Sequence, residues 1–369
     1  MKKKIVSLIA IALMLVFLIP GAAQAVGGLS IIASNAEVLF PNAIAFNISA
    51  QSDVNITDIR LHYTVERLEH AKITSEVYIT FTPIKSVAQQ YILDMKKTGG
   101  FPPGTNLDFW WTLTDAGGNR LATTPKQVHI EDGRYTWQSL KEGLVTLYWY
   151  KGDAAFGSEL MDATQQALKR LSENTGAELK DPVSIYVYAS TTDLQGSMIF
   201  SQDWTGGVAF TQYGVIAIGI APDSASVAWG KGAISHELTH LVVHQVIFNP
   251  YNELPTWLDE GLAMYSEGAL GLEFTSALAA AEKNNKLISV RSLASPFSAY
   301  SDQAILAYAE SYEIVSYLIS EYGRDKMLEL LNVFGQGSGY DEAFNKVYGF
   351  DMDGLNVLWQ ASLVGAVVR

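Results

Sequence analysis

The sequence contains no cysteine among its 369 residues, which excludes disulfide bonds, thiolate metal ligands and a lipid anchor on an N-terminal cysteine. Positive charge is scarce: the chain has 25 lysines and arginines but 38 aspartates and glutamates, which gives a formal net charge of −13. Such an acidic chain repels nucleic acid and anionic lipid, so neither is expected as a partner. After the N-terminal segment, no apolar run reaches the roughly 18 residues that a membrane-spanning helix needs.

The first 25 residues follow the pattern of a secretory signal peptide. Lys2 to Lys4 form a basic segment, residues 5–19 form an apolar segment that is short for a membrane span, and Ala23-Gln24-Ala25 fits a cleavage site. Cleavage would remove three of the 25 basic residues and none of the 38 acidic ones, which leaves a formal charge of −16. We therefore expect a protein that bacteria secrete or hold at the cell surface, without stable membrane insertion; an uncleaved anchor is the alternative.

Residues 27–132 contain short segments in which apolar and polar side chains alternate, as at 44–48 and 59–63. Residues 107–114 predict a further strand, and Asp115 to Asn119 predict a hairpin turn after it. This spacing of strands favours a β-sandwich of the immunoglobulin or fibronectin type III kind. Such a module could bind substrate or cell wall, or act as a spacer, and all three roles stay open.

The rest of the chain shows a different pattern. Strands expected at 144–150 and 183–189 flank an amphipathic helix at about 156–175, and residues 270–369 are mostly helical in pattern. A buried strand at 213–221 is expected to form the sheet edge beside a cleft. We therefore expect an α+β chain in three parts: a signal peptide (1–25), a β-sandwich domain (27–132) and a domain with a largely helical C-terminal lobe (133–369).

Residues suited to chemistry gather in His236-Glu237-Leu238-Thr239-His240 and Trp257-Leu258-Asp259-Glu260-Gly261. A helix is expected through the first motif, beginning at residues 223–224 and ending at Asn249-Pro250. On a helix, side chains four positions apart lie on one face, roughly 6 Å from each other, so both imidazoles can bind one metal ion. A catalytic zinc needs a third protein ligand and an open position for water, and Glu260 is the best-placed candidate.

Glu237 lies about 100° around the helix from His236, at the margin of the metal-facing side. It can therefore miss the metal and still reach a water molecule bound there, whose pKa zinc lowers to about 7. Glu237 would take the proton from this water and pass it to the leaving amine, as in zinc hydrolases that cut peptides. The alternative is an amphipathic helix that carries two histidines and no metal.

Both motifs, with 19 residues between His240 and Glu260, resemble those of the gluzincin metallopeptidases, above all bacterial proteins with a Peptidase MA-like domain. Residues 255–265 match the pattern Pro-x-Trp-Leu-x-Glu-Gly-x-Ala-x-Tyr, and the resemblance extends over roughly residues 135–369. It implies a zincin fold, a peptide or protein substrate and one zinc ion per chain. The implied ligands are His236, His240 and Glu260, and the implied general base is Glu237.

The resemblance also implies a tyrosine that donates a hydrogen bond to the oxyanion of the tetrahedral intermediate. Tyr308 is the main candidate, because it lies early in a helix expected at 304–322; Tyr300 and Tyr312 are the alternatives. Such a donor contributes about 3 kcal/mol to transition-state stabilisation. Because the chain has 18 tyrosines, a purely structural role for Tyr308 stays open.

The chain departs from the family pattern at two places, Met264 and residues 206–209. Met264 replaces an aspartate that orients a metal-binding histidine in thermolysin-like enzymes, and methionine cannot accept the imidazole proton. Glu267, further along, is similar to a glutamate of the aminopeptidase type, or it is a solvated surface acid. Residues 206–209 lie where aminopeptidases hold a free N-terminus, but they lack the acidic side chain. This weakens an aminopeptidase assignment and leaves endopeptidase or narrow-specificity cleavage open.

The other histidines show no ligand pattern. His244 follows His236 by eight residues, about 12 Å along a helix, so it cannot share one tetrahedral ion with both His236 and His240. We predict a structural role for His244. His62, His70 and His129 lie in the first domain without ligand spacing.

The sequence as a whole favours an exported zinc metallopeptidase. The principal alternative is a binding or scaffold protein of the cell surface whose zincin domain has lost activity. Hydrolysis of a non-peptide amide or ester would use the same residues. No pattern in the chain indicates a cleavage preference or an oligomeric state.

Overall fold

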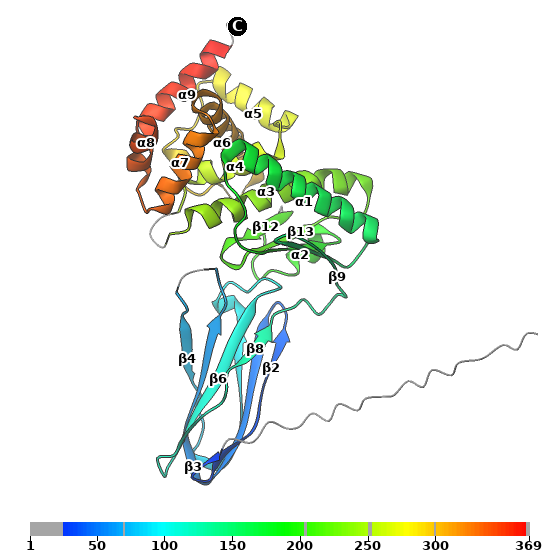
Figure 1. Ribbon diagram of the computed structural model, residues 1–369, viewed down its shortest axis with the longest axis vertical. Helices are drawn as coiled ribbons and strands as arrows, with labels where there is room; N and C mark the ends of the chain where they lie inside the picture. Colours follow the sequence, from blue (N-terminus) through cyan, green and yellow to red (C-terminus); the bar gives the residue numbers. More distant parts are fainter. Residues whose placement is uncertain (1–24, 69–70, 203–204, 250–252, 299, 367–369) are drawn as a thin grey trace, which may run out of the picture.

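A computed structural model describes residues 25–68, 71–202, 205–249, 253–298 and 300–366 of the chain. Residues 1–24 of the expected signal peptide and His70 lie outside these residues. Figure 1 shows the N-terminal strands at one end of the molecule and the C-terminal helices at the other, with a second sheet between them. Among the described residues, no helix combines the length and the apolar character that crossing a bilayer requires.

The N-terminal part is one connected sheet. Its strands are β1 (Ala25–Val26), β2 (Leu29–Leu39), β3 (Ala43–Val65), β4 (Thr74–Tyr78), β5 (Ile84–Asp94), β6 (Asn106–Asp115), β7 (Arg120–Ala122) and β8 (Lys126–His129). The first half of β3 pairs with β2 and β5, and its second half pairs with β4 and β6. Alternate side chains, among them Phe46, Phe109 and Trp111, are buried in an apolar core.

The strands predicted at 44–48 and 59–63 are two parts of the single strand β3, and the strand predicted at 107–114 is β6. The polar residues between the two parts of β3 stay extended, because Ile56 is buried there and pairs with both β5 and β6. The structure thus confirms a sheet domain at the N-terminal end of a mixed α and β protein.

The second sheet has the strand order β12-β13-β11-β10-β9. These strands are β9 (Gln138–Glu142), β10 (Val145–Trp149), β11 (Val183–Tyr188), β12 (Gly207–Phe210) and β13 (Val215–Gly219). The prediction that the strand at 213–221 forms the sheet edge is wrong, because β13 lies inside the sheet and β12 forms the edge. All five residues of β13 are buried, as expected of a strand with neighbours on both sides, whereas β12 is only half-buried.

Helices α1 (Ala154–Thr175) and α3 (Ser224–Ile247) pack together on one face of the second sheet. Asp153 and Asp223 begin them, because each carboxylate accepts hydrogen bonds from backbone N–H groups of the first turn. The other face carries the short helix α2 (Thr191–Gln195) and aromatic side chains. There the buried carboxylate of Asp132 accepts hydrogen bonds from Arg134 and Tyr188, close to the junction between the two sheets.

The C-terminal lobe is helical, as predicted. Its helices are α4 (Thr256–Glu267), α5 (Leu272–Lys283), α6 (Ser301–Tyr322), α7 (Arg324–Gly335), α8 (Tyr340–Tyr348) and α9 (Met352–Ala366), and single 3-10 turns occur at Met95–Lys97, Thr211–Tyr213 and Ser292–Ala294. The helix predicted at 304–322 is α6, which begins three residues earlier. Helices α4 and α6 pack closely, and α4 in turn packs on α3.

Candidate metal centre

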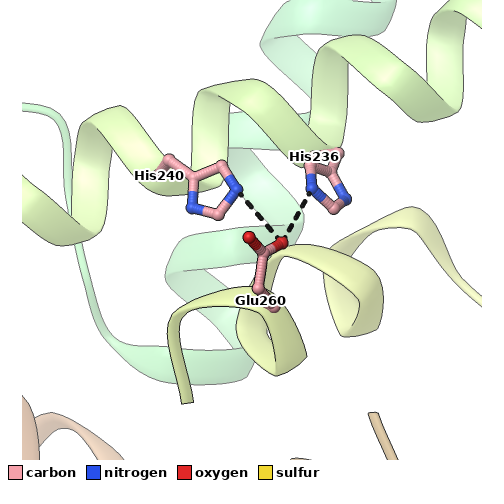
Figure 2. A group of neighbouring side chains, drawn as sticks. All are labelled: His236, His240 and Glu260. Atoms are coloured by element: carbon pink, nitrogen blue, oxygen red, sulfur yellow. Dashed lines mark ion pairs between the residues drawn. The ribbon is translucent and has the colours of Figure 1, made fainter. Parts of the chain in front are cut away.

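Helices α3 and α4 bring three potential metal ligands to one point. His236 and His240 lie one turn apart on α3, and Glu260 reaches toward both from α4, as Figure 2 shows. The far side of α3 is anchored by side chains such as Ile234 and Leu238, which are buried in the core of this lobe. The apolar face of the helix therefore fixes the direction in which the two imidazoles point.

The ligand atoms of this group fit a single divalent cation. One nitrogen of each histidine and one oxygen of Glu260 all lie within 4.8 Å of one another. Glu260 Oε2 is 3.4 Å from His236 Nε2 and 3.7 Å from His240 Nε2, close to the ~3.3 Å between ligands of a tetrahedral zinc ion. Within the described part of the chain, this buried oxygen has no hydrogen-bond partner, which is costly unless a cation binds there.

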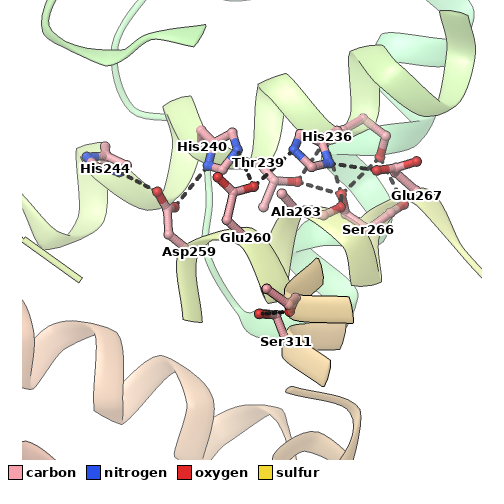
Figure 3. A network of polar contacts seen from close by, with 12 residues as sticks. His236, Thr239, His240, His244, Asp259, Glu260, Ala263, Ser266, Glu267 and Ser311 are labelled. Atoms are coloured by element: carbon pink, nitrogen blue, oxygen red, sulfur yellow. Dashed lines mark hydrogen bonds and ion pairs between the residues drawn. The ribbon is translucent and has the colours of Figure 1, made fainter. Parts of the chain in front are cut away.

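The opposite nitrogen of each imidazole is held by a carboxylate, as Figure 3 shows. His236 Nδ1 lies 2.6 Å from Glu267 Oε1, and His240 Nδ1 lies 3.0 Å from Asp259 Oδ1. Because these carboxylates hold the Nδ1 atoms, the Nε2 atom of each histidine is the one that faces Glu260, and it can bind a metal ion once it gives up its proton. Glu267 is therefore not a free surface acid, and Met264 has no part in this orientation. Sequence reasoning missed Asp259, although it is the residue next to Glu260.

His244 lies outside the ligand group but contacts the same network. Its Nε2 is 3.1 Å from Asp259 Oδ2, so Asp259 bridges His240 and His244. Burial opposes ionisation of Asp259, but the two imidazoles outweigh it and hold the pKa of this carboxyl well below its usual range. His244 lies eight residues after His236, which is too far for a shared metal ion. The same spacing places it one turn beyond His240, where it reaches the carboxylate of Asp259.

Buried hydroxyl groups lock the two helices together behind the ligands. Thr239 Oγ1 lies 2.7 Å from Ser266 Oγ, and Ser235 Oγ donates to the backbone oxygen of Ser266 at 2.9 Å. Ser266 also lies 2.7 Å from the backbone oxygen of Ala263. These bonds fix the spacing of α3 and α4, on which the distance between the histidines and Glu260 depends. Ser235 and Thr239 directly precede His236 and His240 in the sequence. This repeated hydroxyl–histidine pair is the signal that could have revealed the contact between the helices.

The group opens into a cleft of about 650 Å³. Glu237, His236, His240 and Glu260 line it, together with residues of the edge strand β12 and of α5 and α6. Burial raises the pKa of Glu237 above its ordinary value, which increases its basicity. A Cβ atom on Gly207 would lie 2.8 Å from Glu237 Oε1, so only glycine lets β12 approach this carboxylate so closely.

The structure separates the three candidate tyrosines. Tyr308 lines the cleft with Glu237 and Glu260, whereas Tyr300 and Tyr312 are not among the described residues that line it. Tyr300 is 69% exposed, and the ring of Tyr312 packs near Tyr265. Burial, together with the charges of Glu260 and Glu237, raises the pKa of Tyr308 above its usual range. Its phenol therefore stays protonated and can donate a hydrogen bond into the cleft.

The carboxylates also bias the two imidazoles toward binding a cation. Burial lowers the pKa of His240, but Asp259 and Glu260 outweigh it and raise the pKa to about 9. Burial acts the same way on His236, where Glu260 and Glu267 raise the pKa well above its usual value. A metal ion that binds the Nε2 atoms must displace these protons.

The two described histidines of the N-terminal sheet, His62 and His129, have partners within that sheet. His62 Nε2 lies 2.9 Å from Thr112 Oγ1, and its ring stacks on Trp110. His129 Nδ1 lies 2.9 Å from Asn106 Oδ1. Within the described residues, neither belongs to a cluster that could hold a metal.

The family of the chain follows from a comparison of its sequence with known families. The sequence model of the Peptidase MA superfamily matches residues 163–365, which is more than half of the chain. This protein belongs to the Peptidase MA superfamily. Membership of the Peptidase MA superfamily confirms the resemblance to gluzincin-type metallopeptidases, and the matched residues include His236 to His240 and Trp257 to Gly261. No curated protein matches the chain.

Several solved structures resemble this chain at low sequence identity. The M1 zinc metallopeptidase from Deinococcus radiodurans is 12% identical, with 90% of this chain and 94% of that chain covered and a TM-score of 0.34. A mutant of that enzyme bound to a Tyr-Ser-Ala substrate is also 12% identical, with coverages of 87% and 90% and a TM-score of 0.38. OgpA from Akkermansia muciniphila is 10% identical, covers 27% of each chain and has a TM-score of 0.21. At these TM-scores, the solved structures add nothing to the assignment of the site.

Proposed function

We propose that this protein is a zinc-dependent peptidase in which His236, His240 and Glu260 hold one zinc ion per chain. The convergence of two imidazole nitrogens and the unpartnered Glu260 oxygen within 4.8 Å carries the proposal. Asp259 and Glu267 support it, because their hydrogen bonds at Nδ1 leave both Nε2 atoms available. When bound, zinc would lower the pKa of a water molecule to about 7 and polarise the scissile carbonyl.

Glu237 is the proposed general base. It lines the cleft next to His236, and burial raises its pKa, which suits a carboxylate that must first accept and then release a proton. Glu237 takes a proton from the attacking water while the new C–O bond forms. It then gives that proton to the amide nitrogen as the C–N bond breaks. The carboxylate is ionised again at the end of each cycle.

Tyr308 is the proposed donor to the oxyanion. Its phenol lies in the same cleft as Glu237 and Glu260 and stays protonated at neutral pH. The ring of Phe297 packs edge-on against it, with centroids 5.2 Å apart, which restricts the direction of the hydroxyl group. A positioned donor of this kind is worth about 3 kcal/mol in the transition state.

The proposed substrate is a peptide or protein that passes through the cleft. Side chains of α3 from Trp229 to His244 line the cleft, a length of about 22 Å along the helix axis with the ligands between its ends. An extended peptide of roughly six or seven residues spans this length. Residues of the edge strand β12 line the same cleft, and a free sheet edge can pair with a peptide backbone. This arrangement favours an endopeptidase.

We also propose export and a division into two domains. In this proposal the signal peptide (1–25) is removed, residues 27–132 form an immunoglobulin- or fibronectin-like domain, and residues 133–369 form the catalytic domain. The separate apolar cores of the two sheets and the gap between β8 and β9 support the boundary. The first domain would then bind substrate or cell wall, or act as a spacer.

A comparison of the wild-type protein with Glu237→Ala and Glu237→Gln tests the proposal. The wild type is expected to cleave casein or a peptide library. Both variants are expected to lose at least about 10²-fold in kcat while they keep one zinc ion per chain. Equal cleavage by Glu237→Ala would contradict the enzyme assignment. A folded native protein without zinc and without cleavage would instead support a scaffold, and hydrolysis of esters or non-peptide amides alone would change the substrate class.

A further inference from the structure

Trp229 is a large apolar residue that is exposed to solvent. Its side chain is 51% exposed, although it belongs to α3, most of whose apolar residues are buried. Ala233 and His236 follow it by four and seven residues, so all three lie on one face of the helix. That face lines the cleft, and Trp229 stands at the end opposite His244. An exposed tryptophan at this place marks a surface for binding rather than for the core.

The neighbouring backbone is shaped around the indole. A Cβ atom on Gly206 would lie 2.9 Å from Trp229 Cη2 and 3.0 Å from Cζ2, so glycine at 206 lets the ring lie against the chain that leads into β12. A pocket of about 430 Å³ opens beside the ring and joins the cleft at Trp229 and Gly206. Its other walls are small or short side chains: Thr191, Gly219, Ala225 and Ser226. The pocket can therefore hold one bulky side chain against the indole face.

We propose that Trp229 forms a specificity subsite that takes a bulky apolar or aromatic side chain of the peptide substrate. This inference rests on the proposed peptidase function and extends it to substrate preference. Trp229 lies about 10 Å from His236 along the axis of α3, and an extended peptide covers that distance in about three residues. The preferred side chain is therefore expected two to four residues from the scissile bond.

The charge of the cleft makes this subsite distinct from the reaction centre. Four carboxylates, those of Glu237, Asp259, Glu260 and Glu267, line the cleft around the histidines. In contrast, none of the described residues that line the pocket beside Trp229 has an ionisable side chain. Burial of an apolar side chain against the indole releases water from both surfaces, whereas a charged side chain would lose its hydration there without a partner. The subsite therefore selects for apolar over charged residues.

Cleavage-site profiling with a peptide library tests the subsite in the active enzyme. The wild type is expected to enrich Phe, Leu or Met at one position two to four residues from the cleaved bond. Trp229→Ala should remove this enrichment and lower kcat/KM about 10-fold for the preferred peptide, but less than 2-fold for its alanine counterpart. Trp229→Phe should retain the preference, and Gly206→Ala should weaken it by displacing the ring. Tyr78→Ala, which removes an exposed aromatic side chain of the N-terminal sheet, is the matched control.

A binding measurement separates failure of the subsite from failure of the peptidase proposal. Glu237→Ala is titrated with an apolar peptide and with the same peptide carrying alanine at the test position. The apolar peptide is expected to bind about 10-fold more tightly, and the difference should vanish in the Glu237→Ala, Trp229→Ala double variant. Equal affinities, or a preference that survives in the double variant, would overturn the subsite whether or not the wild type cleaves peptides.

Discussion

Glu267 Oε1 lies 2.6 Å from His236 Nδ1, and this contact determines which nitrogen of the imidazole faces Glu260. The carboxylate reaches the imidazole from the last residue of α4, two turns after Glu260, so one helix supplies both a proposed ligand and the group that orients another proposed ligand. In this chain Glu267 takes the orienting role that Met264 cannot fill.

Removal of the Glu267 carboxylate should therefore weaken metal binding. Glu267→Ala is expected to lower zinc affinity 10- to 100-fold, because the imidazole of His236 loses the acceptor that fixes its orientation. Glu267→Gln should lose less, since its amide oxygen can still accept the Nδ1–H. Competition with a chromogenic chelator measures both constants. Glu273→Ala, which removes an exposed acid of α5, is the control, and an affinity loss as large in this control would contradict the prediction.

The hydrogen bonds of Asp259 to His240 and His244 predict which substitution weakens zinc binding more. Asp259→Ala should reduce zinc affinity more than His244→Ala does, because Asp259 contacts the imidazole of His240 directly and His244 acts only through Asp259. In the double variant, the loss of His244 should add almost nothing to the loss of Asp259. Chelator competition on the single and double variants gives the three affinities. Additive losses would show that His244 acts independently of the carboxylate.

Gly207→Ala should damage catalysis without damage to the metal centre. The new Cβ would lie 2.8 Å from Glu237 Oε1, and the end of this flexible side chain can move at little cost to stability. We expect a fall in kcat of at least about 10-fold, with unchanged zinc content and a melting temperature close to that of the wild type. Gly133→Ala, where a Cβ would meet no atom within 4 Å, is the matched control. Wild-type kcat in Gly207→Ala would argue against Glu237 as the base.

Glu310 should make the stability of the protein depend on pH. The residue is fully buried, and both its carboxylate oxygens accept hydrogen bonds from the backbone N–H of Ile288. Burial raises the pKa of Glu310 to about 7 from 4.5. Between these values the unfolded chain releases a proton that the folded protein keeps, so the free energy of unfolding falls as pH rises.

Glu310→Gln isolates this effect, because glutamine can still accept the Ile288 hydrogen bond but does not titrate. Relative to this variant, the wild type should lose on the order of 3 kcal/mol of unfolding free energy between about pH 4.5 and pH 7. Denaturant unfolding of both proteins across this range measures the difference. If the unfolding free energies of the two proteins differed by the same amount at every pH, Glu310 would have the same pKa in the folded and the unfolded protein.

The convergence of His236, His240 and Glu260 was predictable because its geometry is local. The i and i+4 spacing of His236 and His240 fixes their common face, and a helix stop before α4 leaves room for Glu260 to approach. The strands and helices with strong apolar periodicity, such as β10, α1 and α6, were predictable for the same reason. In each case the decisive contacts lie within one segment or between neighbouring segments.

The remaining features depend on contacts that no local pattern contains. The edge position of β12 follows from its pairing with β13, and the sequence of β13 shows only that it is buried. The hydrogen bonds of Asp259 and Glu267 require the crossing of α3 and α4, which the chain pattern does not specify. The unbroken length of β3 depends on two different partner strands, which compensate for the polar residues in its middle.

Diffraction from crystals grown with zinc, recorded on both sides of the zinc absorption edge, locates any zinc ion that the protein binds. We predict one anomalous peak per chain, about 2.0–2.2 Å from Nε2 of His236, Nε2 of His240 and a carboxylate oxygen of Glu260. The peak should be absent from crystals of His240→Ala grown in the same way. A peak centred between His244 and Asp259, or a wild-type crystal without zinc at the three residues, would contradict the account.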